Sequence, residues 1–293
     1  MAGDDRWVVP TRQQAVGQFT REPLTTATDL RPVARGQQRD RKVIGVGLRQ
    51  NGASMPEQQM GAFWDQRARE NAYFFVDNRR GYRDHDLDAF WAGGEEDLAG
   101  IIELLGLEIT PTDEVLDIGC GPGRLTRALA TRAAAVQGID VSAEMIELAR
   151  KHNATVENVT FIHGDGTSLS GVQDESVNGV FSHVVFQHIP DPQITLGYVR
   201  EIGRVLKPGG WAAFQISNDP TIHKPPKASS PIRLASRVLA VLGRRPRGQT
   251  NPAWLGSAVD LGELRQAANE SGLTLEQIVG EGTQFCMIRA RRV

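Results

Sequence analysis

The hydrophobic positions of this chain change their spacing several times, and each change predicts a different element. The run EVLDI at 114–118 is short, apolar and partly β-branched, which is typical of a buried parallel strand. Helical spacing follows over 124–132, where Leu125, Ala128 and Leu129 share one face. Four more apolar runs alternate with helical or turn patterns up to residue 217. This alternation predicts an α/β fold built on a parallel sheet.

The patterns on either side of this block predict helices before it and a strand pair after it. The stretch MGAFWDQRARENAYFFVDN has a helical period, and a second helical pattern covers Leu87–Leu105. We interpret residues 56–112 as an N-terminal helical cap and residues 113–293 as the main domain. Near the end, a helix at 260–271 precedes two strand patterns, which a hairpin signal joins at Glu281-Gly282.

Two segments depart from these patterns. The first 55 residues are rich in Arg, Gln, Gly, Pro and Thr without a sustained period, so we expect residues 1–55 to form a disordered tail. Residues 219–253 interrupt the fold after the fifth strand, and their centre at 232–242 has the pattern of a basic amphipathic helix. We interpret this insertion as a lid over the site. Contact with a membrane surface is the alternative for such a helix.

The composition narrows the range of partners. The net charge is −2, so no overall attraction to nucleic acid is expected. No apolar run reaches the ~18 residues of a membrane span, and we see no signal-peptide pattern. The two cysteines and six histidines show no disulfide or metal-ligand spacing. We therefore expect a cytoplasmic protein without a metal site. Its oligomeric state stays open.

Three alternate glycines follow the strand at 114–118, in the run DIGCGPG. Glycines at these positions allow positive φ and place no Cβ between the backbone and a ligand. Dinucleotide enzymes favour G-x-G-x-x-G, whereas the spacing here is G-x-G-x-G with Asp117 in front of it. An acid at this position repels a pyrophosphate but pairs with an ammonium group. A second acid, Asp140, ends the next strand, where ribose hydroxyls are expected to bind.

The glycine run resembles motif I of the class I S-adenosylmethionine-dependent methyltransferases. The block 115–217 is similar to the methyltransferase type 11 group, because it also carries the segments QHIPD and LKPGG. The resemblance implies a Rossmann-like, seven-stranded, mostly parallel sheet with an antiparallel last strand and helices on both faces. It also implies S-adenosyl-L-methionine as cofactor and direct displacement of its methyl group. The acceptor stays open, since members methylate O-, N- and C-nucleophiles on many small molecules.

The resemblance assigns site residues as well. His188 and His183 are candidate general bases, because the usual pKa of histidine lies near neutral pH. The expected cofactor-binding residues lie around the strand ends: Asp117, Gly119, Cys120, Gly121, Gly123, Asp140, Val141, Met145, Gly164, Asp165, Gly166 and Ser182. An acid in the position of Asp165 is expected to bond the adenine amino group. The expected lid or substrate residues are Tyr73, Arg79, Arg80, Tyr82, Phe186, Gln187, Arg233 and Arg237, and an Arg of the cap is expected to hold the cofactor carboxylate.

Two other functions are compatible with these residues. A regulatory protein that binds S-adenosylmethionine without catalysis uses most of the same side chains. Another nucleotide-cofactor enzyme on a Rossmann-like sheet is the second alternative, and the glycine spacing with Asp117 argues against a dinucleotide.

Overall fold

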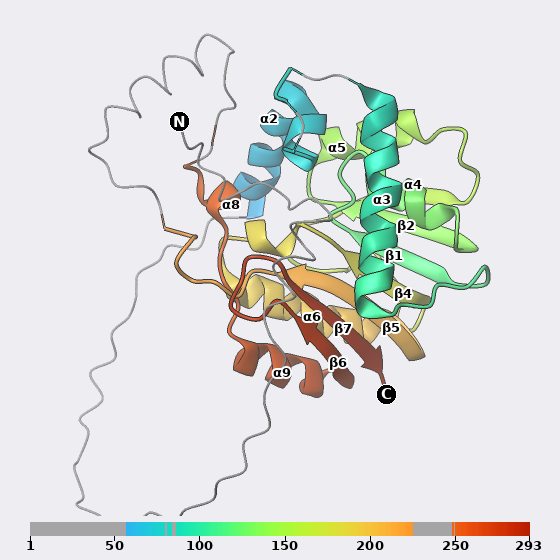
Figure 1. The fold of residues 1–293 in the computed structure, drawn as a ribbon, viewed down its shortest axis with the longest axis vertical. Helices are drawn as coiled ribbons and strands as arrows, with labels where there is room; N and C mark the ends of the chain where they lie inside the picture. Colours follow the sequence, from blue (N-terminus) through green and yellow to red (C-terminus); the bar gives the residue numbers. More distant parts are fainter. Residues whose placement is uncertain (1–56, 80, 84–85, 225–247, 249) are drawn as a thin grey trace, which may run out of the picture.

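A mixed seven-stranded sheet forms the centre of the protein (Figure 1). A computed structural model describes residues 57–79, 81–83, 86–224, 248 and 250–293. The strand order is β3-β2-β1-β4-β5-β7-β6; β1 to β5 pair in parallel, whereas β7 is antiparallel to β5 and β6. The predicted sheet with an antiparallel last strand is confirmed. The strands are β1 Glu114–Ile118, β2 Ala135–Asp140, β3 Val159–His163, β4 Val177–Ser182, β5 Leu206–Ile216, β6 Leu273–Val279 and β7 Cys286–Arg292.

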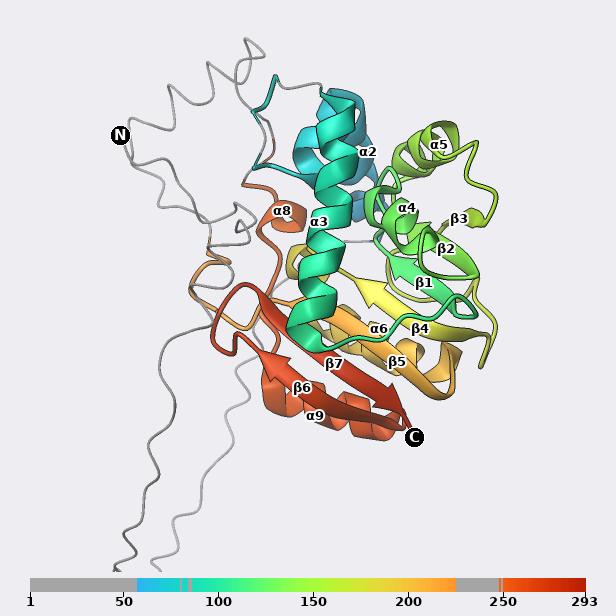
Figure 2. The same cartoon turned by 45° about the vertical axis from the view of Figure 1, so that its right-hand side comes forward.

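Helices cover both faces of this sheet (Figure 2). The helices are α2 Glu57–Val76, α3 Leu87–Leu105, α4 Arg124–Ala130, α5 Ala143–His152, α6 Pro192–Val205, α8 Pro252–Leu255 and α9 Leu261–Glu270, with a 3-10 turn, η2, at Phe186–His188. Val115 and Phe181 are buried under α3 and α4, whereas Leu116 and Phe214 are buried with α6 and α9 on the other face. Because successive strand residues point to opposite faces, a strand covered on both sides is apolar throughout.

The two helices before the sheet have defined ends and one kink. α3 begins at Asp86, whose side chain accepts a hydrogen bond from the N–H of Ala89, and ends at Gly106 with a φ of 57°. α2 is kinked at Asn71, where φ is −171° and ψ is 85°. The Asn71 side chain stabilises the kink by donating to the carbonyl oxygen of Tyr82 at 2.7 Å. α2 packs against α5 on both sides of the kink, through Ala68 before it and Ala72 after it.

Several predicted features fall outside the described residues. These are the tail at 1–55, the helix at 232–242, and the side chains of Arg80, Arg233 and Arg237. Within the described residues, none of the helices combines the length and the apolar character that crossing a bilayer requires.

The predicted hairpin is confirmed, because β6 and β7 pair antiparallel and the loop between them contains Glu281 and Gly282. Residues 280–285 join β6 to β7, a longer connection with positive φ at Gly280 and Gly282. The loop is held by Asn218 at the end of β5, whose side chain accepts from the N–H of Gly282 and whose own N–H donates to Thr283. The bonds to Asn218 explain why this loop is longer than the two-residue turn that the sequence predicts.

Candidate functional site

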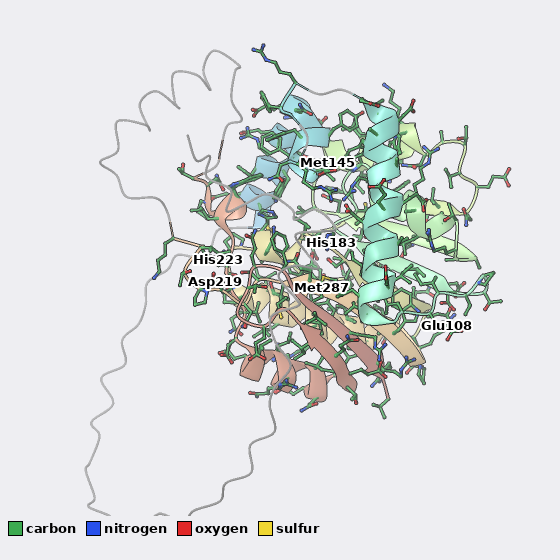
Figure 3. All side chains as sticks on the ribbon, in the orientation of Figure 1. Glu108, Met145, His183, Asp219, His223 and Met287 are labelled. Carbon is green, nitrogen blue, oxygen red and sulfur yellow. The ribbon has the colours of Figure 1, made fainter. Side chains whose placement is uncertain are left out.

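A cavity lies where the carboxyl ends of β1, β2 and β4 meet α2. The empty space in it, including the open mouth, is about 1060 Å³. Figure 3 labels two residues that line it, His183 after β4 and Met145 on α5. Of the predicted cofactor and base residues, it brings together Asp117, Gly119, Cys120, Gly121, Asp140, Val141, Met145, Gly164, Gly166, His183 and His188.

The glycine loop is fixed by bonds to the end of β2. The N–H groups of Gly119 and Cys120 donate to the carbonyl oxygen of Ile139 at 2.7 and 3.1 Å. Positive φ values are found at Gly119, Gly121 and Gly123, and a Cβ on Gly119 would lie 2.3 Å from Val185 Cγ2. The N–H groups of Gly119, Cys120 and Gly121 are therefore bonded within the protein. Glycine is required at position 119 by the positive φ and by the close approach of Val185.

Asp140 connects this loop to α5. Its Oδ2 accepts the N–H of Gly121 at 2.9 Å, and its Oδ1 accepts the N–H of Ser142 at 2.8 Å. Burial raises the pKa of Asp140, while these two hydrogen bonds act in the opposite direction. Each carboxylate oxygen keeps a further lone pair for a hydroxyl donor.

A second acid, Asp117, lies deeper at the end of β1. It is 2% exposed and accepts a hydrogen bond from Thr126 Oγ1 at 2.6 Å. Burial raises its pKa to about 7, and the charge of Asp140 adds to this effect. Arg124 of α4 also lines the cavity; its Nη1 donates to Asp97 at 2.7 Å, while its buried Nε–H has no hydrogen-bond partner. No pattern in the sequence singles out Arg124.

Gly123, Asp165 and Ser182 do not line the cavity. Asp165 is exposed, and its Oδ1 accepts the N–H groups of Thr167 and Ser168, both at 2.7 Å. These local bonds hold the carboxylate within its own loop, and the expected contact of Asp165 with adenine stays a prediction. Ser182 is buried and donates to the carbonyl oxygen of Ile118, and Gly123 packs at the start of α4 against Asn153 and Phe161.

The two candidate bases differ in their surroundings. His188 Nδ1 lies 2.9 Å from the carbonyl oxygen of Trp254, which assigns the ring proton to Nδ1, and Gln187 Nε2 donates to Nε2 at 3.2 Å. Burial lowers the pKa of both His188 and His183 to about 4. The buried Nδ1 of His183 has no hydrogen-bond partner. A role for His188 as base requires its bond to Gln187 to open and stays a prediction.

Comparisons with known proteins agree with this geometry. The Methyltransferase domain family matches residues 116–214. The ubiquinone biosynthesis O-methyltransferase of Thiobacillus denitrificans is 30% identical over 174 residues, which are 57% of this chain and 67% of that protein. The chain belongs to the class I S-adenosylmethionine-dependent methyltransferases, type 11 group.

Further relatives support this family. The ubiquinone biosynthesis O-methyltransferase of Nitrosospira multiformis is 30% identical over 57% of this chain, which spans 65% of that relative's length. The demethylmenaquinone methyltransferase of Staphylococcus aureus is 35% identical over 37% of this chain and 45% of its own length. An S-adenosylmethionine dependent methyltransferase from Mesorhizobium loti has the same fold, with a TM-score of 0.50 and 20% identity over 69% of this chain and all of that one.

The cavity of this methyltransferase fits its family's cofactor. The glycine loop lines the cavity next to Asp117, whose carboxylate suits the ammonium group of the methionine portion. The orphaned Nε–H of Arg124 suits a carboxylate, and Asp140 offers acceptors to two ribose hydroxyls. Val141, Met145, Gly164 and Gly166 leave an apolar wall for the base.

The expected lid and substrate residues with described side chains do not line this cavity. Arg79 is engaged by both Asp77 and Asp97, so its guanidinium is not available to the cofactor carboxylate. Tyr73 Oη lies 2.8 Å from His152 Nε2, and Tyr82 Oη donates to Glu70. Phe186 belongs to the core and Gln187 to a buried amide cluster.

α2 supplies side chains that the sequence argument did not assign to the site. Met60, Trp64, Phe75 and Val76 line the cavity. Their helical spacing indicates a buried face, but it does not reveal which element that face contacts. Cys120 also lines the cavity, and burial raises the pKa of its thiol well above the usual range, which does not favour a nucleophile.

Proposed function

We propose that this protein transfers the methyl group of S-adenosylmethionine to a small-molecule acceptor by direct displacement. The observation that carries the proposal is one cavity shared by the glycine loop, two strand-end acids and an unpartnered histidine, His183. When bound, the cofactor supplies an electrophilic methyl group on a positively charged sulfur. The protein's task is then to align acceptor and methyl group, since proximity and orientation provide much of the acceleration.

We infer a compact apolar acceptor that carries an aromatic hydroxyl. The part of the wall contributed by α2 consists of the apolar side chains of Met60, Trp64, Phe75 and Val76. Such a wall favours a planar apolar molecule and disfavours a charged one. Two relatives named for O-methylation in ubiquinone biosynthesis support the choice of an oxygen nucleophile.

His183 is our candidate for the group that receives the hydroxyl proton. Its low pKa keeps the imidazole neutral at pH 7, so a ring nitrogen can accept a hydrogen bond from the acceptor. This nitrogen would receive the proton that the hydroxyl loses during methyl transfer and would release it to water. No other histidine that lines the described cavity has a ring nitrogen without a hydrogen-bond partner.

Labelled cofactor tests the proposal. S-adenosylmethionine is expected to raise the melting temperature, whereas NAD is not. Methyl label is expected to reach substituted phenols and catechols in preference to primary amines, and His183→Gln is expected to lower turnover about 10²-fold or more while cofactor affinity is retained. If NAD alone raised the melting temperature, the assignment of S-adenosylmethionine as the cofactor would be wrong. Labelling of amines alone, or normal turnover of His183→Gln, would overturn the acceptor class or the role of His183 respectively.

We also propose a cytoplasmic setting and a small molecule, not nucleic acid, as the partner. Two free, buried cysteines are compatible with a reducing compartment. The cap at 56–112 and the insertion at 219–253 are proposed to cover the methyltransferase domain, and the apolar side chains that α2 places in the cavity support the first of these.

A further inference from the structure

The segment that follows β4 has a strained residue held by a buried glutamine. Val184 has a φ of 59°, in the left-handed region that a β-branched residue rarely adopts. Its backbone N–H donates to Gln215 Oε1 at 2.9 Å, and Gln215 is fully buried on β5. Such a conformation is unfavourable, so it persists only where the surroundings enforce it.

Gln215 is itself fixed by other buried amides. Its Nε2 donates to Gln187 Oε1 at 2.9 Å and to the carbonyl oxygen of Gln284. Gln187 and Gln284 are 2% and 8% exposed, so water does not readily replace these bonds. Since Nε2 faces acceptors and Oε1 faces the Val184 donor, a flip of the Gln215 amide breaks every one of these bonds.

The shape of this segment determines what reaches the cavity. Val184 and Val185 both line it, directly after His183. Val185 packs against the glycine loop so closely that Gly119 has no room for a Cβ. A change of φ at Val184 therefore displaces Val185 from Gly119 and turns His183 relative to the loop.

We propose that Gln215 is a positioning residue for the cofactor site. Its carboxamide oxygen holds Val184 in the left-handed conformation, and this conformation sets Val185 against Gly119. Gln215 does not line the cavity, so its effect passes through Val184. The inference rests on the proposed use of S-adenosylmethionine.

A double-mutant cycle tests it, with calorimetric binding of S-adenosylhomocysteine as the readout. Gln215→Met removes the acceptor for the Val184 N–H at similar volume, and Val184→Gly makes positive φ accessible without that acceptor. Gln215→Met is expected to weaken binding about tenfold in the parent, but less than about threefold in the background of Val184→Gly. An equal loss in both backgrounds, or no loss in the parent, would overturn the proposal.

A matched control separates positioning from general stability. Leu264→Ala creates a cavity under α9, where the side chain is fully buried, and is expected to lower the melting temperature without changing the affinity. If both variants lose affinity in proportion to their melting temperatures, the specific role of Gln215 is wrong. A parent that binds no S-adenosylhomocysteine overturns the proposed function and this inference together, whereas a parent that binds without coupling overturns the inference alone.

Discussion

Asp65 on α2 accepts a hydrogen bond from Ser142 Oγ at 2.7 Å, and Ser142 is the residue that caps α5. The same Asp65 oxygen also accepts the backbone N–H of Glu144 at 3.2 Å. α2 thereby places a carboxylate at the N-terminal end of α5, where the helix dipole is positive. Ser142, the residue at this end, follows Asp140 of β2 by two positions in the sequence. The helix that carries the apolar wall and the part of the cavity beside Asp140 are thus joined by the Asp65 side chain.

This relationship predicts the effect of Asp65→Ala. Removing the carboxylate loosens α2 from α5, so S-adenosylhomocysteine is expected to dissociate about fivefold faster, equivalent to ~1 kcal/mol. Stopped-flow displacement measures the rate. Asp88→Ala, which changes an exposed acid at the start of α3, serves as the control. Equal dissociation rates for the two variants would contradict a role of Asp65 at the site.

Asp140 and Asp165 are expected to differ in their effects on cofactor binding. Asp140→Ala removes acceptors that line the cavity and is expected to weaken binding by at least ~1 kcal/mol. Asp165→Ala is expected to weaken it less, since that carboxylate is bonded within its own loop. Titration calorimetry with S-adenosylhomocysteine compares them. A larger loss for Asp165→Ala would restore the adenine contact that the sequence indicated.

Cofactor affinity is expected to rise with pH through the titration of Asp117. Its pKa of about 7 in the folded protein means that the carboxyl group is neutral at pH 5 and ionises as the pH approaches 7.5. Only the ionised form pairs with the ammonium group of the cofactor. Affinity measured over this interval is expected to increase in the parent and to change much less in Asp117→Asn. A parent affinity that is flat over the same interval would argue against the pairing.

The two cavity histidines are expected to make stability depend on pH. His183 and His188 have pKa values of about 4 in the folded protein against 6.5 for an ordinary histidine. Between pH 6.5 and 4 the unfolded chain therefore binds more protons, so these groups lower the free energy of unfolding as the pH falls through that interval.

Urea unfolding of the parent and of His188→Gln, at pH 4.5 and pH 7, measures this contribution. The parent is expected to lose more stability between the two pH values than the variant does. The comparison of parent and variant isolates the contribution of His188, because Asp117 changes the free energy of unfolding in the opposite direction. The pKa of Asp117 is raised in the folded protein, so its protonation stabilises the folded state as the pH falls. Identical losses for parent and variant would show that His188 is not buried in its neutral form.

The sequence predicted those parts of the site that depend on local patterns. The β1 strand, the glycine turn and Asp140 follow one another along the chain, so spacing alone places them together. Asp165 also carries a local signal that the predicted adenine contact does not use, because Thr167 and Ser168 stand where an acid bonds the following backbone. Arg124 and the α2 wall depend on contacts between distant segments, which no local pattern contains.

The way in which the glycine loop is held has a consequence for the evolution of this protein. Its hydrogen bonds run to Ile139 and Asp140, both at the end of β2, while α2 approaches it through the side chain of Val76. Substitutions at Trp64 and Phe75 can therefore remodel the proposed acceptor end without removing these hydrogen bonds. A lineage with this architecture is free to exchange one acceptor for another while it inherits an unchanged cofactor end.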